Sequence, residues 1–288
     1  MELFTAAKDL EYLDAHQIIS EAVKILAKSF QQKLFWITLT FTLPLSLIQL
    51  ISGRNYSSLL IIRSFSTHEF YYVLSLFLFS LLSTSAVVFT VASLYASKPV
   101  SFIPTLFAIP RVFEHLMMTF FYILLLMIVN FLAFCGIPAA VLFWLNIDDE
   151  ALIFGFLGIF LIMYIPVHFH VIVSWNLASV ISVVEPNVYG LAAMKKSKQL
   201  LQGRTRIALH LAGLYFSATW FVEHHVFQPV MQFQVHLLVK LLLGLVCLFM
   251  LVAVNLTGLL VQCVFFLACK NHHNQVVDKK VLYDYLGG

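Results

Sequence analysis

Charged residues are scarce in this sequence. Aspartate, glutamate, lysine and arginine together make up 11% of the 288 residues, whereas 61% are hydrophobic and the mean hydropathy is +0.93. A single soluble core in a chain of this length cannot bury so much apolar surface, which excludes an ordinary soluble domain. The apolar runs do not alternate in segments of about ten residues, which excludes the pattern of a membrane β-barrel. We therefore predict an all-α integral membrane protein that forms a single membrane domain over residues 1–288.

Cysteine is rare and the common catalytic motifs are absent. The cysteines lie within or at the ends of apolar runs without paired spacing, which favours packing over disulfide or metal roles; they are Cys135, Cys247, Cys263 and Cys269. The HExxH, GxSxG and spaced-aspartate motifs do not occur. On a helix the rings of His168 and His170 point in nearly opposite directions, so they share a metal only if Pro166 breaks the helix. We therefore expect no enzyme, with no catalytic residue, metal site or cofactor, and no nucleic-acid partner.

What the sequence has instead is long apolar runs. A helix needs about 20 apolar residues to cross a membrane, and six runs approach or exceed that length. They cover residues 34–51, 70–96, 117–145, 151–184, 207–222 and 237–268, and the fifth is the shortest. We therefore predict a bundle of six transmembrane helices over residues 34–269. The first run begins only at Leu34, so we expect it to act as the targeting signal in place of a cleaved signal peptide.

The basic residues are distributed unevenly over the predicted loops. With six spans, fourteen lysines and arginines fall on the side of both termini and three on the opposite side. Positive charges in short loops stay cytosolic. We therefore expect a cytosolic N-terminus and a cytosolic tail over residues 270–288. The loops on the opposite side carry five acidic residues against those three basic ones.

Two amphipathic segments precede predicted spans on the cytosolic side. Residues 1–33 are predicted to form an N-terminal amphipathic helix, in which Asp14 and Gln17 make a capping box. Residues 187–203 have the same character, because their apolar residues and their lysines fall on opposite arcs of a helix. Both segments are therefore predicted to be cytosolic interface helices.

A third candidate interface segment covers residues 101–115. Pro104 and Pro110 predict that any helix there is short or broken. With this segment the chain divides into three units of an interface helix plus two spans.

The helix over residues 187–203 has two interpretations. It lies in the headgroup plane, where each lysine gains about 1 kcal/mol from anionic lipid, or it packs beneath the bundle as an elbow. Its candidate lipid contacts are Lys195, Lys196, Lys198, Arg204 and Arg206.

The chain resembles a plant family of six-span membrane proteins in the segment WNLASVISVVEPNVYGLAAMKKSKQLLQGR and in the tail CKNHHNQVVDKKVLYDYLGG. More distantly it resembles bacterial six-span families of unknown function, in the pattern Glu185, Gly190, Ala193, Ser197, Leu200 and Gly203. These motifs imply architecture rather than chemistry. The chain is also similar to plant immune cation channels of the endoplasmic reticulum. That resemblance implies a calcium-permeable, ring-like homo-oligomer, with a pentamer as one candidate.

Polar residues near the membrane centre and acids in the non-cytosolic loops each have two interpretations. Asn130, Asn176 and Asn255 hydrogen-bond between helices, at about 0.6 kcal/mol each, or line a hydrated path. The acids are solvated turns in a monomer, whereas a ring repeats each acid in every subunit and gathers cations at a pore mouth. The candidate acids are Glu69, Asp148, Asp149, Glu150 and Glu223.

Two functions from different classes follow from these observations. The first is a homo-oligomeric, cation-permeable channel, for calcium or potassium, in an internal membrane such as the endoplasmic reticulum, with a role in plant defence signalling. The alternative is a non-enzymatic membrane scaffold or lipid-handling protein that acts through its cytosolic interface helices. Membrane lipids are partners in both.

Overall fold

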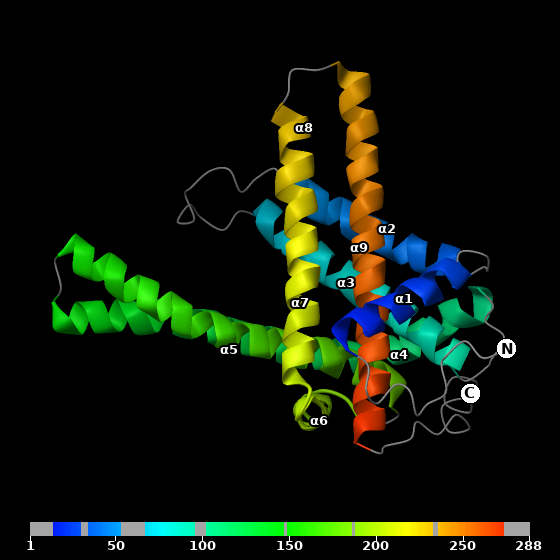
Figure 1. Ribbon diagram of the computed structural model, residues 1–288, viewed down its shortest axis with the longest axis horizontal. Helices are drawn as coiled ribbons and strands as arrows, with labels where there is room; N and C mark the ends of the chain where they lie inside the picture. The colour runs from blue at the N-terminus through cyan, green and yellow to red at the C-terminus, as the bar shows by residue number, and fades with distance from the viewer. Residues whose placement is uncertain are drawn as a thin grey trace.

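The described part of the chain is entirely helical. The computed structural model describes residues 14–29, 34–52, 67–95, 102–146, 149–185, 188–232 and 236–273 (Figure 1). Within these ranges every regular element is a helix, which confirms the all-α prediction. The elements are α1 (Ala15–Ser29), α2 (Leu34–Ser52), α3 (Thr67–Tyr95), α4 (Phe102–Leu145), α5 (Glu150–Val184), α6 (Leu191–Leu201), α7 (Thr205–Trp220), the π-helix η2 (Phe221–Phe227), α8 (Gln228–Gln232) and α9 (Leu237–His272).

Each of the six predicted apolar runs coincides with a helix. Among the described residues four helices are long and apolar enough to cross a membrane: Leu74–Ala92 within α3, Glu114–Leu145 within α4, α5, and α9. The first run corresponds to α2, whose apolar stretch Leu39–Leu50 is shorter. The fifth corresponds to α7, which η2 and α8 continue. The protein is therefore of the helical membrane type, with four helices of spanning length in its described part.

The prediction of a short or broken interface helix over residues 101–115 is wrong. α4 begins at Phe102 and continues through Pro104 and Pro110 as one helix of 44 residues. Pro104 lies in the first turn, where a backbone N–H has no partner within the helix, so its missing N–H costs nothing there. Pro110 removes one hydrogen bond from a helix that continues on both sides of it. Ahead of the predicted spans, only α1 and α6 are separate short helices in the described ranges.

The buried side chains gather where one end of each long helix meets the others, a region called the base below. There α1 packs against α9 and α7, and α6 packs against α5, α4 and α9. The fully buried large side chains of the base include Ile18, Leu116, Ile181, Leu200 and Phe266. Beyond the base the hairpins diverge: in Figure 1 the α4–α5 hairpin extends to the left and α7, α8 and α9 extend upward. The predicted six-span bundle is thus joined mainly at its base.

α1 packs against α9 and α7 as an amphipathic helix. The predicted capping-box bond is present, because the Asp14 N–H donates to Gln17 Oε1 at 3.0 Å. The buried residues of α1 are spaced three and four apart, as one helix face requires; they are Ile18, Ala22 and Ile25. Residues 1–13 and 30–33 of the predicted N-terminal segment lie outside the described residues.

The turn before α6 is docked on α4, and α6 therefore begins later than predicted. Gly190 has a φ of 61°, which glycine adopts without strain, and its N–H donates to Thr119 Oγ1 at 2.8 Å. A Cβ at Gly190 would lie 3.1 Å from the Tyr122 ring. Next to it Tyr189 stacks on His115, with 4.6 Å between the ring centroids. This turn orients α6 across the base.

Candidate functional site

A buried ion cluster ties α5, α6 and α9 together at the base. Glu185, where α5 ends, is 8% exposed and forms ion pairs with Lys196 of α6 and with Lys270 of α9, the latter at 2.6 Å. Lys270 Nζ also lies 5.5 Å from the centroid of the Phe266 ring. Reasoning from the sequence missed this cluster. The available signal was a single acid at the end of an apolar run, just before a stretch rich in lysine.

The five basic residues predicted to contact lipid divide into two groups. Lys195, Lys198 and Arg206 are exposed, whereas Lys196 is held by Glu185 and Arg204 is 6% exposed. The buried residues of α6 include four of the predicted apolar arc, Ala193, Met194, Leu200 and Leu201, whereas Tyr189 of that arc precedes α6 and is 41% exposed. α6 therefore packs as an elbow beneath the long helices and still presents two lysines outward.

The part of the α4–α5 hairpin beyond the base, residues 124–146 and 149–170, is called the arm. Almost none of the most apolar stretches of α4 and α5 is buried by the rest of the chain. Phe143 and Trp144 near the tip are 87% and 85% exposed, and Phe154 on α5 is 71% exposed. The described chain therefore leaves the arm's apolar surface for lipid or for another protein surface to cover.

A polar cluster joins the two helices of the arm near the middle of α5. Asn130 Nδ2 lies 3.2 Å from His168 Nδ1, and the Tyr164 hydroxyl donates to the Asn130 carbonyl at 3.3 Å. The Tyr164 hydroxyl also lies 3.4 Å from His168 Nδ1. A row of rings, Phe156, Phe160, Tyr164 and His168, continues along α5 beside this cluster.

α5 continues as a helix through Pro166, so the possible break beside the two histidines is absent. Across the part of the chain that the structure describes, no three His, Cys, Asp or Glu side chains come together as a metal site.

The predicted pore-mouth acids lie on different elements. Asp149 and Glu150 are exposed at the tip of the arm, where Asp149 Oδ1 accepts the Ala151 N–H at 2.8 Å and caps α5. Glu223 lies half-buried in η2, on the other hairpin. Glu69 is in the first turn of α3, but its side chain, like the whole of Asp148, lies outside the described residues. Within one chain the arm tip and η2 belong to hairpins that diverge (Figure 1).

Asn255 is a buried junction between three helices. Its Oδ1 accepts from the Tyr215 hydroxyl at 2.7 Å, and its Nδ2 donates to Ser46 Oγ at 2.9 Å and to Gln49 Oε1 at 2.7 Å. Gly258 makes this possible, because a Cβ there would lie 2.6 Å from the Tyr215 ring. Of its two interpretations, interhelical hydrogen bonding describes Asn255, which is 2% exposed.

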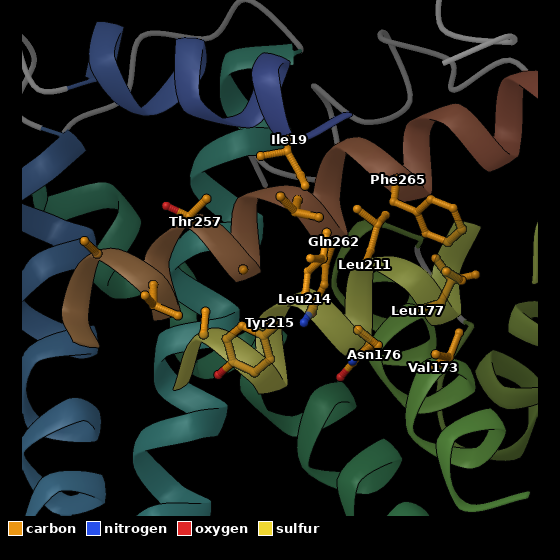
Figure 2. A pocket seen from close by; sticks show the side chains of 17 residues that line it. Ile19, Val173, Asn176, Leu177, Leu211, Leu214, Tyr215, Thr257, Gln262 and Phe265 are labelled. Carbon is orange, nitrogen blue, oxygen red and sulfur yellow. The ribbon is translucent and has the colours of Figure 1, made fainter. Parts of the chain in front are cut away.

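Asn176 lines a cavity of about 340 Å³ between α5, α7 and α9, with α1 at one side (Figure 2). The lining is mostly apolar, and Gln262 of α9 reaches into it from the side opposite α5. The three predicted asparagines therefore have three different environments: an interhelical pair in the arm, a cavity wall and a buried junction.

These features define a class: a helical protein of the membrane type, with its core at a common base and an arm that the described part of the chain leaves uncovered. Residues 61–288 match the family model described as Domain of unknown function (DUF8558), and the chain belongs to that family. No curated protein and no solved structure matches the chain.

Proposed function

We propose that the protein is the subunit of a homo-oligomeric, cation-permeable channel in which the arm lines the conducting path. The observation that carries the proposal is the polar cluster of Asn130, Tyr164 and His168 at the base end of an apolar arm that the described chain leaves uncovered. Polar groups at membrane depth are costly and usually face a hydrated path or another polar group. In a ring of arms the polar cluster faces a hydrated path, and neighbouring copies cover the apolar flanks of each arm.

The position of the cluster suits a span. His168 lies 18 residues after Glu150 and 17 before Glu185, which at 1.5 Å per residue is about 26 Å from each end of α5. A hydrated site near the middle of a bilayer lowers the barrier for a cation there, where the hydrocarbon core is about 30 Å thick. The exposed Asp149 and Glu150 at the tip then act at the mouth, repeated once per subunit.

The membrane and assembly are part of the same proposal. The six crossings, the cytosolic termini and the acidic opposite side rest on the distribution of charges over the loops. The endoplasmic reticulum, calcium or potassium as the permeant ion, a pentameric ring and a role in plant defence rest on the resemblance to plant immune channels.

Recording from the purified protein in planar bilayers, with asymmetric potassium and calcium solutions, tests this function. We expect discrete currents that reverse toward the cation equilibrium potential. Neutralising the tip with Asp148→Asn, Asp149→Asn and Glu150→Gln together should lower conductance or cation selectivity severalfold, because the acids concentrate cations. Glu114→Gln is the matched control, since this exposed acid lies at the other end of the arm helix α4. Unchanged permeation in the triple variant would remove the tip from the mechanism.

A second candidate is a scaffold or lipid-handling protein, favoured by the exposed Lys195 and Lys198 on α6. Each lysine near an anionic surface contributes about 1 kcal/mol, so Lys195→Glu with Lys198→Glu should weaken anionic vesicle binding by at least about 30-fold. Lys196 is left unchanged, because it holds Glu185. Silent bilayers that contain intact oligomers, together with this loss of vesicle binding, would favour the second candidate over the channel.

A further inference from the structure

The cavity between α5, α7 and α9 has the composition of a site for a mostly apolar molecule. Its volume of about 340 Å³ lies near the lower end of the range for small-molecule pockets. Thirteen of its seventeen lining residues have no polar side-chain atom. Five small residues, Ala208, Ala212, Ala218, Ala253 and Gly258, leave space between the helices. A molecule or part of one with an apolar body therefore fits it.

Two side-chain amides face this cavity without a partner among the described residues. Figure 2 shows Gln262 reaching from α9 into the pocket, with Asn176 and Tyr215 on the side toward which its amide points. Within the described part of the chain neither the Asn176 nor the Gln262 amide forms a hydrogen bond. The Tyr215 hydroxyl, by contrast, is already bound to Asn255. An amide in apolar surroundings without a partner costs free energy that a bound polar group recovers.

The lack of charged side chains among the described residues around the cavity favours a neutral polar group on the ligand. None of the described residues that line it is charged. The ion cluster at the base is separated from it, because Glu185 lies nine residues after Asn176 and Lys270 eight after Gln262, about 12–14 Å along each helix. A charged headgroup in the cavity would have no counter-charge, which is strongly unfavourable. A hydroxyl both donates and accepts, as two amides require.

We propose that this cavity binds one neutral lipid, whose hydroxyl hydrogen-bonds to Asn176 and Gln262 and whose apolar body packs against α5, α7 and α9. Ile19 of α1 lines the same cavity, so the N-terminal interface helix covers part of the ligand. A sterol and a diacylglycerol share this chemistry. This proposal rests on the residues of the cavity alone and does not depend on whether the protein conducts ions.

Photoaffinity labelling of the full-length protein in nanodiscs tests the proposal. Four clickable, photoactivatable probes are compared: a sterol, a diacylglycerol, a phosphatidylcholine and a fatty acid. We expect the sterol or the diacylglycerol to label peptides of α5, α7 or α9, and the unlabelled form of that lipid to compete. Labelling by whichever of the two binds identifies the lipid.

Three variants locate the ligand. Ala212→Phe fills the cavity, whereas Asn176→Leu and Gln262→Met keep its volume and remove the amides; each should reduce labelling at least fivefold. Gln199→Met removes an exposed amide on α6, and Leu152→Phe adds bulk on the arm; neither should change labelling. Because the two amide variants are close in size to the native residues, they test the site even if Ala212→Phe fails to fold. Equal labelling of all variants, or labelling by the charged probes as strong as by the neutral ones, would overturn the proposal.

Discussion

The ion cluster at the base allows a quantitative test of how the interface helices are held. The perturbation is Glu185→Gln, which keeps the size of the side chain and removes its charge. Among the described residues Glu185 is the anionic partner of both Lys270 and Lys196, whose side chains are 11% and 29% exposed, and the variant removes that partner. Because α5, α6 and α9 meet at Glu185, we expect the variant to loosen the whole base rather than one helix end.

The magnitude follows from the burial of the three side chains. Removing one partner of a buried ion pair costs about 3–5 kcal/mol, because the remaining charge is left uncompensated. The partial exposure of Lys196 reduces its share, so we take about 3 kcal/mol for Glu185→Gln. Adding Lys270→Met removes the more buried uncompensated charge, and the double variant should recover about 2 kcal/mol of that loss.

Thermal unfolding of the detergent-purified protein measures both effects. About 3 kcal/mol corresponds to a fall in Tm of about 6–12 °C for a chain of this size class. The fall should persist in 1 M salt, since buried pairs are screened little. The control is Lys24→Met, which removes an exposed pair with Glu21 and should leave Tm unchanged. A fall of less than about 2 °C for Glu185→Gln, or a double variant no more stable than the single one, would refute the reasoning.

Two further predictions concern the buried junction on α9. Asn255→Leu removes the hydrogen bonds of Asn255 with the Tyr215 hydroxyl, Ser46 Oγ and Gln49 Oε1, and should lower the free energy of unfolding by about 2 kcal/mol in chemical denaturation; a loss under 0.5 kcal/mol would mean that water replaces the amide. Gly258→Ala places a methyl group 2.6 Å from the Tyr215 ring and should cost about 1–3 kcal/mol in the same assay. Gly155→Ala meets no atom within 4 Å and should cost nothing, so equal losses at the two glycines would contradict the packing described.

Much of the fold follows from the sequence because apolar length and helical periodicity are local properties. The six apolar runs, the amphipathic character of α1 and the buried face of α6 all depend on residues within one segment. The unbroken α4 does not follow in this way. A proline predicts a break from its own position alone. α4 continues through Pro110 because the chain is helical both before and after it, and the proline alone does not indicate this.

The environment of each polar residue could not be predicted, because it depends on which helices meet. Asn130, Asn176 and Asn255 are equivalent in sequence terms, each a single amide in an apolar run. Asn255 meets partners on α2 and α7, Asn130 meets a histidine on the adjacent helix, and Asn176 faces a cavity. Glu185 is a similar case, since its partner Lys270 is 85 residues away in the sequence.

The central claim is that the arm lines a hydrated cation path, and cysteine accessibility during bilayer recording tests it most directly. The parent protein carries Cys135→Ser, which removes the exposed native thiol of α4. Asn130→Cys then places a thiol at the polar cluster. The account predicts that a water-soluble, positively charged thiol reagent reduces the single-channel current of the Asn130→Cys protein and not that of the parent. Currents that the reagent leaves unchanged in both proteins, with the channel intact, would contradict the claim.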